Sequence, residues 1–586
     1  MNYKLNKTDV NQWKESFFTS IKKLFPLMKW ENKNLTITLI MVIITSLASL
    51  ITPIIITHTI DNAVKNGDYN GILINSLFLF LIFIVWAWAN YFQTIVMWWV
   101  GRRILFNLRN TLFIKLQELP VSFFNQNKSG DLISRINNDT DKLNMFFSQS
   151  LMQFLGNFFL IFGSGIFILV LNFELWLFVL LPALFIFIIS QILSSWVKRK
   201  NKENLEATWA MSSEIQENLN NFKVIVAFNR LDYFRKKFEN YNQKNYIAGL
   251  KAWNANNIFV PIYSFASNVA QLITLCYGIY LIQNGNLTVW LLIGFLFYVN
   301  NFYTPLRQLA SVWSSFQLAL ASLSRIWEVL SLQTDLEVIQ DKKIYETNAI
   351  LEFRNVWFHY VEGKEILKNI NFSLEKWKTY ALVWPTWWGK TTTAQLMARL
   401  YDPTSGNIIL DKKDMKSYAS LERTKKIWFI LQEPFLFTGN LKDNILYANE
   451  EYINYSIEQT DKLLKEMWLS DLLSKFDAGL ETEISVNGDS ISLWQKQLIA
   501  FIRAILRKPE LLILDEATAN IDTVTEELLE SMIEKLPKYT TKVIIAHRLN
   551  TIKNADCIFF VNSWEIINTW SMENAIEMLL HGKSES

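Results

Sequence analysis

The stretch Thr379-Tyr-Ala-Leu-Val-Trp384-Pro-Thr-Trp-Trp-Gly389-Lys390-Thr391-Thr392 decides the fold of the second half of the chain. It opens with a short apolar run typical of a buried strand, and a helical pattern follows Thr392. Between them, Gly389-Lys390-Thr391 completes the phosphate-loop pattern G-x-x-x-x-G-K-[ST], although Trp384 stands where that pattern begins with glycine. A strand, a phosphate loop and a helix in this order predict an α/β P-loop domain.

This loop is predicted to bind the phosphates of a nucleotide. The Lys390 ammonium is expected to pair with the β- and γ-phosphates, and the Thr391 hydroxyl to bind Mg²⁺. The start of the following helix would hold the phosphates, because its backbone N–H groups have no partners inside the helix. The predicted nucleotide-binding residues in this stretch are Trp384, Pro385, Thr386, Trp387, Trp388, Gly389, Lys390, Thr391 and Thr392.

Further short apolar runs predict the other strands of the same domain. Helical patterns separate several of them, and this alternation is typical of a mainly parallel sheet with helices on its faces. The predicted strands are Ala349–Phe353, Thr379–Val383, Ile408–Leu410, Leu511–Leu514, Lys542–Ala546 and Cys557–Val561. We therefore expect a nucleotide-binding domain over residues 349–586, preceded by a linker over residues 331–348.

One of these strands ends in two carboxylates, Asp515 and Glu516. In nucleotide hydrolases with a phosphate loop, a metal-linked aspartate belongs at such a strand end. Asp515 is therefore predicted to bind Mg²⁺, and Glu516 to polarise the attacking water.

The first half of the chain is rich in apolar runs long enough to span a bilayer, which takes about 20 residues per helix. Six spans are predicted, and they define a membrane domain over residues 35–330. Asn268 and Gln271 interrupt the fifth span. The predicted spans are Leu35–Ile56, Ile72–Trp98, Leu151–Leu171, Leu175–Leu193, Ile258–Ile282 and Val289–Leu309.

Basic residues predict the orientation of these spans, because they are concentrated in cytoplasmic loops. They occur throughout residues 1–34, after the second span and after the fourth, whereas the opposite loops are short and contain little besides Lys65. Both termini are therefore expected in the cytoplasm of a multi-pass protein of the cytoplasmic membrane. The long stretches Gly101–Met145 and Lys198–Asn257 are amphipathic and read as helices that continue out of the bilayer. They lack the strand and turn signals of the alternative, two small cytoplasmic domains.

Composition excludes several other classes of protein. The formal net charge is only +3, which leaves no strong basic excess for nucleic acid. Two cysteines, Cys276 and Cys557, cannot build a disulfide framework or a cysteine-only metal site. The partners expected from the sequence so far are membrane lipid and a nucleotide, and no nucleic acid.

Together the motifs resemble an ATP-binding cassette transporter of the exporter type, in the half-transporter layout, and the match covers nearly the whole chain in order. The signature motif, usually L-S-G-G-Q, corresponds to Ile491-Ser-Leu-Trp494-Gln495, and the membrane half matches at Ser129-Gly-Asp-Leu-Ile-Ser-Arg135. The resemblance implies that Tyr360 stacks on adenine, that Gln432 touches Mg²⁺ and that His547 holds the γ-phosphate. It adds Ser492, Trp494, Gln495 and Asp522 to the nucleotide-binding residues.

The family implies the function and its partners. Two subunits share their ATP sites, because the signature of one completes the site of the other, so a homodimer or heterodimer is expected. ATP hydrolysis would drive export of a substrate that the residues do not identify, with Glu516, His547 and Gln432 as catalytic residues and Thr391, Gln432 and Asp515 around Mg²⁺. The alternative is a catalytically degenerate or regulatory half that pairs with an active subunit. A soluble ATPase with a membrane anchor fits the six spans poorly.

Tryptophan replaces the family's glycine at several positions, among them Trp377, Trp384, Trp387, Trp428 and Trp494. Read literally, indoles in the phosphate loop fill the space that the phosphates need. Three explanations compete: gene decay, a degenerate partner, or UGA codons read as tryptophan that the source organism reads as glycine. The third accounts for one-directional replacement beside intact Lys390, Glu516 and His547. It also fits the combined number of glycines and tryptophans, 41, which is about the 7% expected for glycine alone.

Overall fold

The structure is a computed structural model of the chain. It describes residues 3–5, 29–64, 66–333, 336, 338–340, 343–360, 363–383, 389–432, 434–467, 469–485, 491–515, 531–533, 536–545, 555–562 and 565–568. The chain divides into two compact units. We call Leu5–Gln117 with Ser129–Ser331 the helical unit, and Met1–Lys4, Glu118–Lys128 and Leu332–Ser586 the α/β unit.

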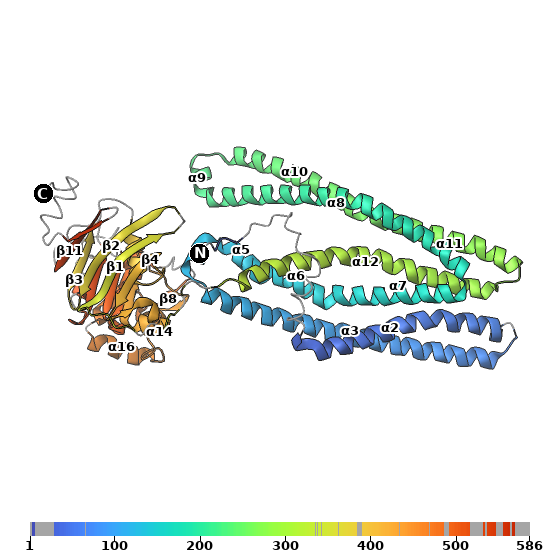
Figure 1. Ribbon diagram of the computed structural model, residues 1–586, viewed down its shortest axis with the longest axis horizontal. Coiled ribbons are helices and arrows are strands. Elements are labelled where there is room, and N and C mark those ends of the chain that lie inside the picture. The colour runs from blue at the N-terminus through green and yellow to red at the C-terminus, as the bar shows by residue number, and fades with distance from the viewer. Residues whose placement is uncertain are drawn as a thin grey trace. The chain divides into compact units, whose positions relative to one another are not determined.

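The helical unit consists of long helices joined by short connections (Figure 1). Among the residues that the structure describes, six helical stretches are long and apolar enough to cross a membrane, so the six predicted spans are confirmed, the interrupted fifth one included. The elements are η2 (Lys29–Glu31), α2 (Asn32–His58), η3 (Thr59–Val64), α3 (Tyr69–Glu118), α5 (Ser129–Ser134), η4 (Arg135–Asp139), α6 (Thr140–Met145), η5 (Phe146–Ser150), α7 (Leu151–Leu171), α8 (Phe173–Asn220), α9 (Phe222–Ala227), α10 (Leu231–Asn257), α11 (Phe259–Gln283) and α12 (Val289–Leu330).

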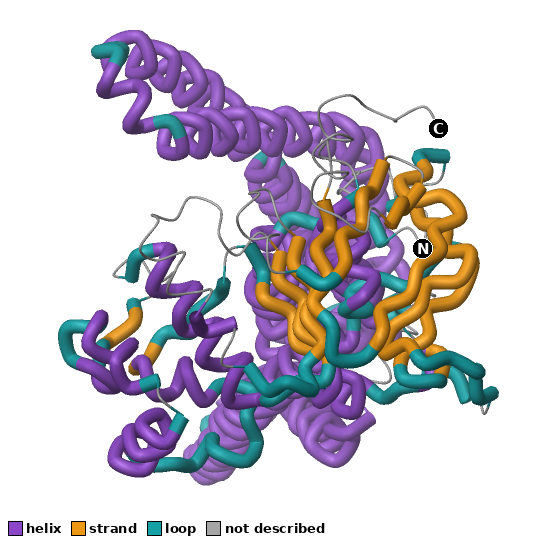
Figure 2. Tube along the Cα trace, turned by 90° about the vertical axis from the view of Figure 1, so that its left-hand side faces the viewer, coloured by secondary structure: helices purple, strands orange, loops and turns teal. Residues whose placement is uncertain are grey.

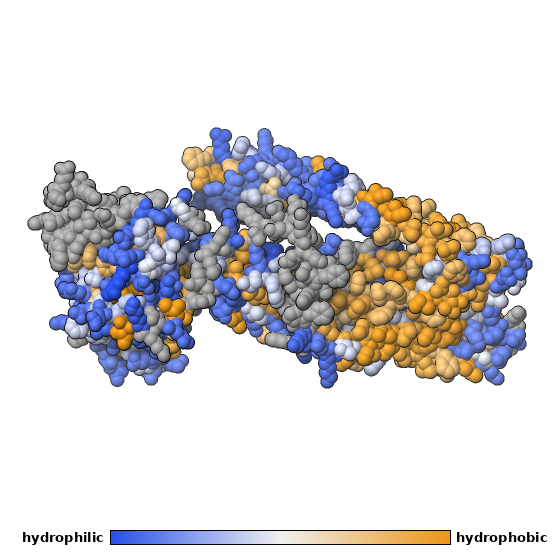
Figure 3. All heavy atoms as spheres, viewed as in Figure 1, coloured by the Kyte–Doolittle hydropathy of each residue, from blue (hydrophilic) through white to orange (hydrophobic). Residues whose placement is uncertain are grey.

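Several of these helices are much longer than a bilayer requires. Helix α3 has 50 residues and α8 has 48, or about 75 and 72 Å at 1.5 Å per residue, against about 30 Å for the hydrocarbon core. Apolar side chains form a broad band over one part of the bundle, while the part of α8 and α10 beside α9 is mostly hydrophilic (Figure 3). The prediction of helices that continue beyond the spans is confirmed for α3, α8 and α10, but the predicted extension Gly101–Met145 is interrupted where α3 ends at Glu118.

Two buried tyrosines of α12 help to hold the bundle together. The Tyr298 hydroxyl donates to the Leu50 carbonyl in α2 at 2.7 Å, and the Tyr303 hydroxyl donates to the Val179 carbonyl in α8 at 2.6 Å. Both rings belong to the apolar core of the unit. A phenol suits this role because its ring is apolar and its hydroxyl can reach a partner.

The α/β unit contains two larger sheets and a two-stranded one (Figure 2). The largest has the order β12-β11-β3-β10-β9-β6, and its pairs are parallel except β11–β12. The second, β2-β1-β4-β5, has antiparallel pairs. The strands are β1 (Ala349–His359), β2 (Glu365–Glu375), β3 (Thr379–Val383), β4 (Ser405–Leu410), β5 (Lys413–Asp414), β6 (Ile427–Ile430), β7 (Gly439–Asn440), β8 (Glu483–Ile484), β9 (Leu511–Asp515), β10 (Thr541–Ile545), β11 (Cys557–Asn562) and β12 (Glu565–Asn568).

This topology confirms the mainly parallel sheet and corrects its membership. The predicted strands Ala349–Phe353 and Ile408–Leu410 do not join it, but pair with each other in the antiparallel sheet. In contrast, Leu511–Leu514 lies inside the parallel sheet and is fully buried. A continuous apolar run of this kind is typical of a strand that helices or a second sheet cover on both faces.

Short helices complete the α/β unit. They are α4 (Val121–Gln126), α13 (Lys390–Met397), η6 (Met415–Ser417), α14 (Ser420–Lys426), α15 (Leu441–Leu446), α16 (Ile457–Glu466), η7 (Ser470–Lys475), η8 (Gly479–Glu481) and α17 (Leu493–Arg507). Although α4 directly follows α3 in sequence, it belongs to this unit. The Asn125 amide donates to the Tyr401 hydroxyl at 2.7 Å.

Candidate functional site

The candidate site lies along the carboxyl edge of the parallel sheet. Strands β3, β10, β9 and β6 are neighbours, and their last residues are in register: Ile545 pairs with both Leu382 and Asp515, and Ile430 pairs with Leu514. Neighbouring strands lie about 4.8 Å apart, so Leu382 and Asp515, two strands apart, are separated by about 10 Å. The connections that leave this edge therefore start close together, as in other open α/β sheets that bind ligands there.

The phosphate-loop stretch leaves this edge after β3 and re-enters the described structure at Gly389. Gly389 has φ = +104°, a backbone conformation that side chains other than hydrogen rarely allow, and it precedes the first residue of α13. Its carbonyl accepts from the Thr393 N–H and hydroxyl, both at 2.8 Å. Lys390 is only 4% exposed, and Thr391, beside it, is exposed. The positive φ gives a physical reason for glycine at this position.

Tyr360 follows β1, in the antiparallel sheet, and lies beside α13. Its hydroxyl donates to the Gln395 side chain at 2.8 Å and shares a hydrogen bond with the Thr392 hydroxyl at 3.1 Å. Burial by these neighbours raises the pKa of the Tyr360 phenol, so it stays protonated at neutral pH. The ring is 40% exposed and meets the Tyr401 ring edge-on at 5.1 Å. Part of the Tyr360 side chain thus stays exposed next to α13.

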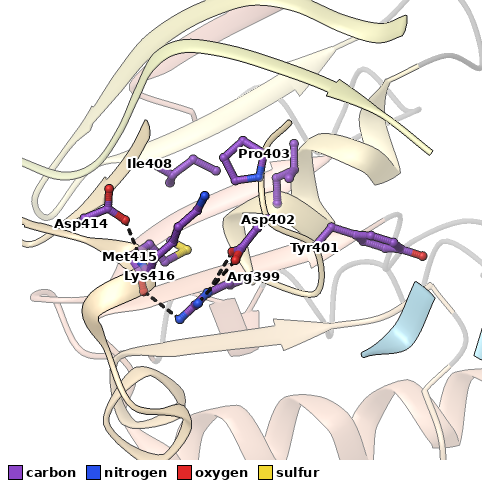
Figure 4. A pocket seen from close by; sticks show the side chains of 9 residues that line it. Arg399, Tyr401, Asp402, Pro403, Ile408, Asp414, Met415 and Lys416 are labelled. Carbon is purple, nitrogen blue, oxygen red and sulfur yellow. Dashed lines mark hydrogen bonds and ion pairs between the residues drawn. The ribbon is translucent and has the colours of Figure 1, made fainter. Parts of the chain in front are cut away.

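Tyr401 lies just beyond the C-terminal end of α13, where Arg399 holds the chain in place. Arg399 is 2% exposed, and its guanidinium bonds Asp402 at 2.9 Å and the Met415 carbonyl at 3.1 Å (Figure 4). In the same view Tyr401 points away from this pocket towards α4, where its hydroxyl meets Asn125. The pocket of Figure 4 lies at the last turn of α13, opposite Gly389, and two of its side chains, Arg399 and Asp402, bind each other. It supports the position of Tyr401 and is distinct from the candidate site.

Three of the predicted metal-binding residues are described. Asp515 ends β9 and is 4% exposed, Thr391 is in the first turn of α13, and Gln432 lies just beyond β6. Helix α13 contacts β9. A buried carboxylate, a hydroxyl and an amide oxygen are hard oxygen donors of the kind that Mg²⁺ prefers, so the donor set fits this ion.

The signature residues form the start of α17. The Ser492 hydroxyl caps the helix by accepting from the Gln495 N–H at 3.4 Å, while the Gln495 side chain accepts from the Ser492 N–H at 3.0 Å. Gln495 also donates to the Lys475 carbonyl at 2.8 Å. Trp494 is half-buried and packs against the apolar core of the unit. The N-terminus of α17 is thus a well-defined capped end.

The structure places some of the predicted site residues close together, and others lie outside the residues it describes. Tyr360 and Thr392 are bonded, and Gly389–Thr392, Gln432 and Asp515 all lie at or next to the same sheet edge. The remaining predictions lie outside the described residues: Trp384, Pro385, Thr386, Trp387, Trp388, Glu516, Asp522 and His547. The roles of all these residues in nucleotide binding and catalysis stay predictions.

Sequence reasoning missed two contacts of this unit. Asn125 bonds Tyr401, and Arg503 of α17 bonds the segment after Gln432. No local pattern marks either residue, because each partner is more than 60 positions away in the chain.

Comparison with known proteins gives the same division of the chain. The family described as the ABC transporter transmembrane region matches residues 35–306, and the ABC transporter family matches residues 367–519. The uncharacterized ABC transporter ATP-binding protein YknV of Bacillus subtilis is 30% identical over 534 residues, which cover 90% of this chain and 87% of that protein. The chain belongs to the ABC transporter family. The fused membrane and ATP-binding regions make this ABC transporter a multi-pass membrane protein of the exporter type, with ATP hydrolysis coupled to transport.

Other relatives of this ABC transporter have more specific names. The ATP-dependent lipid A-core flippase of Pectobacterium atrosepticum is 28% identical over 564 residues, 96% of each chain. The fatty acid ABC transporter ATP-binding/permease protein of Mycobacterium tuberculosis is 28% identical over 496 residues, 84% of this chain and 76% of that protein.

Proposed function

We propose that this ABC transporter is one half of an ATP-driven exporter of the cytoplasmic membrane, with both termini in the cytoplasm. The observation that carries the proposal is the carboxyl edge of the parallel sheet, where Gly389–Thr392, Gln432 and Asp515 gather in a chain that also has six spans. In open α/β sheets, ligands bind at the carboxyl ends of the strands, so ATP would bind and be hydrolysed at this edge.

The proposed chemistry uses this chain's residues in distinct roles. The exposed part of the Tyr360 ring stacks on adenine, and Lys390 pairs with the β- and γ-phosphates. Thr391, Gln432 and Asp515 would hold Mg²⁺, which supplies positive charge against the phosphates when bound. Glu516 accepts a hydrogen bond from the attacking water and orients it in line with the γ-phosphorus. His547 stabilises the charge that develops as the bond to the β-phosphate oxygen breaks.

A test of this function starts from the full-length protein in lipid nanodiscs. We expect Lys390→Ala and Asp515→Asn each to reduce ATPase activity at least a hundredfold, as electrostatic partners of phosphoryl transfer do. Lys378→Ala is a matched control, because Lys378 immediately precedes β3, at the opposite edge, with a 48% exposed side chain paired to Glu375. Equal ATPase activity in wild type and Lys390→Ala would refute the proposal.

We propose a second subunit, in which Ser492 of one chain completes the ATP site of the other. Apolar surface on the helical unit supports this. Around α9, Phe222 is 55% exposed, Val224 54% and Phe228 74%, an apolar tip between hydrophilic helices. Native mass spectrometry of the purified transporter should show two chains; identical masses indicate a homodimer, and a stable monomer with full ATPase activity contradicts shared sites.

We also propose that the tryptophans at family glycine positions are glycine in the native protein. Trp377 supports this, since it has φ = +68° in the turn between β2 and β3. It is the only aromatic residue with positive φ in the described parts of the chain, and a bulky side chain is an outlier there. Mass spectrometry of tryptic peptides from the native protein over residues 377–390 should give glycine masses.

Tryptophan at Trp384 and Trp387 in the native protein would favour the alternative function, a degenerate half of a heterodimer. Lys390, Asp515, Glu516 and His547 argue for the active form, because all of them are kept. The names of two relatives specify lipids as cargo, so amphipathic lipids are the first substrates to test, by their stimulation of ATPase activity in nanodiscs of defined composition.

A further inference from the structure

Arg503 is a buried cation on α17 whose bonds reach towards Gln432. It is 8% exposed. Its Nη1 donates to the Phe435 carbonyl at 2.9 Å, its Nε to the Asn444 carbonyl and its Nη2 to the Asn444 side-chain oxygen at 3.0 Å. The guanidinium also lies 5.4 Å from the centre of the Tyr447 ring. Burial lowers the pKa of Arg503 to about 10, so it remains charged at neutral pH among uncharged partners.

Asn444 extends these bonds along the chain. It is 1% exposed, and its side-chain oxygen also accepts from the Phe437 N–H at 2.8 Å. Its amide donates to the carbonyls of Phe437 and Asn440, at 2.8 and 3.1 Å. We call Arg503, Asn444, Phe435 and Phe437 the arginine clip. The clip joins the segment that follows Gln432 to α15 and to the middle of α17.

The two ends that the clip connects both belong to the proposed ATP site. Gln432 lies three residues before Phe435 in sequence, and Ser492 lies eleven residues before Arg503, about 16 Å along the helix axis. Between them, α17 is buried from Gln497 to Leu506 and shares an apolar core with Leu436 and Ile445. A helix packed in this way moves as a rigid element, so its capped end follows the clip.

We propose that Arg503 is a positioning residue that makes the Gln432 segment and the signature helix move as one body during the ATPase cycle. This inference rests on the proposed function. The planar guanidinium reaches two carbonyls and an amide oxygen in fixed directions, whereas a lysine ammonium is a point charge on a flexible stem and cannot satisfy all three. Buried acceptors left without donors let the segment loosen.

Arg507, one helical turn further on, offers a matched control. It also donates to carbonyls, those of Thr424 and Ala448. Its partners, however, lie at α14 and after α15, not in the segment that follows Gln432. Arg507→Lys thus disturbs the same helix and the same type of bond without opening the clip.

The kinetic experiment compares Arg503→Lys and Arg507→Lys in full-length protein in nanodiscs. We expect Arg503→Lys to lower kcat for ATP at least tenfold and to change KM less than threefold, because Tyr360 and Lys390 lie outside the clip. Arg507→Lys should keep kcat within twofold of the wild-type value, even if its melting temperature falls as much as that of Arg503→Lys. In the double variant Arg503→Lys/Asn444→Ala, kcat should fall no further than in the worse single variant. Equal kcat losses in the two lysine variants would overturn the proposal.

Hydrogen exchange tests the clip without ATP turnover and so separates its failure from failure of the proposed function. Arg503→Lys should speed amide exchange at least tenfold in Phe437–Leu446, and Arg507→Lys should not. A wild type without ATPase activity refutes the proposed function, whereas unchanged exchange in Arg503→Lys refutes the clip itself.

Discussion

A buried charge cluster in the helical stretch that precedes the third span should be a major source of stability for the helical unit. Asp139 is completely buried in η4. Its carboxylate pairs with Arg325 of α12 at 3.0 Å and accepts from Lys142 and Ser322 at 3.2 Å each. Arg325 in turn pairs with Asp131 at 2.6 Å. The perturbation is Asp139→Ala, which removes the buried carboxylate, while Arg325 keeps its pair with Asp131 and Lys142 is 43% exposed to solvent.

The size of the effect follows from burial. Removing one partner of a buried ion pair costs about 3–5 kcal/mol when the remaining charge is left uncompensated. Here Arg325 keeps Asp131 and Lys142 is partly exposed, so the lower end of that range, about 3 kcal/mol, applies. The helical unit is larger than about 250 residues, so at an unfolding entropy of about 2.1 cal/mol/K per residue each kcal/mol shifts the melting temperature by about 1.5 °C. The melting temperature should therefore fall by about 4–5 °C. Asp139→Asn keeps an oxygen for Ser322 and should cost less, about 1.5–3 kcal/mol.

The assay is thermal unfolding in detergent, followed by tryptophan fluorescence. Glu206→Ala is the control, since its pair with Lys202 spans 3.8 Å and the two side chains are 60% and 54% exposed; such pairs contribute about 0–1 kcal/mol. The double variant Asp139→Ala/Arg325→Ala should lose less than the sum of the single losses, because each single variant already removes the Asp139–Arg325 pair. If Asp139→Ala melts within about 2 °C of Glu206→Ala, the cluster does not stabilise the unit and the reasoning is wrong.

Three further predictions concern the α/β unit. Tyr360→Ala should raise KM for ATP about 5- to 150-fold, the loss of one base–aromatic stack of about 1–3 kcal/mol, and Tyr360→Trp should restore it in ATPase titrations. Gly389→Ala places a side chain at φ = +104°, so nucleotide binding measured by calorimetry should fall at least tenfold while Lys378→Ala binds normally. Burial alone would raise the pKa of Asp411, but hydrogen bonds from Lys376 and Lys426 outweigh it and lower the pKa to about 2. The pKa of an aspartate in the unfolded chain is about 3.9, so the Asp411 carboxylate stabilises the fold above that pH by about 1–2 kcal/mol and loses this contribution as the pH falls towards 2. The difference in melting temperature between wild type and Asp411→Asn should therefore be constant from pH 5 to 8 and shrink below pH 4.

Part of this transporter could be predicted because its signals are local. A spanning helix needs only enough apolar residues in a row, so all six spans were found, although α3 and α8 extend well past the predicted ends. The strand Thr379–Val383 was predicted with its observed bounds. Its buried residues, the loop and the helix after it follow one another in the chain, so their pattern needs no distant partner.

Other features depend on partners that are far away in sequence. The runs Ala349–Phe353 and Ile408–Leu410 look like the strands of the parallel sheet, because alternation and β-propensity do not encode which neighbour a strand pairs with. Likewise the segment Glu118–Lys128, predicted as part of a helical extension, contains a break after α3 and belongs to the α/β unit. The sequence alone determined the order of spans, strands and nucleotide motifs, since each is a short-range pattern of burial and turn chemistry. Only the tertiary structure decided that Tyr360 meets Thr392, that Asn125 meets Tyr401 and that Arg503 clasps the Gln432 segment, because such bonds form between side chains that the fold brings together from separate parts of the chain.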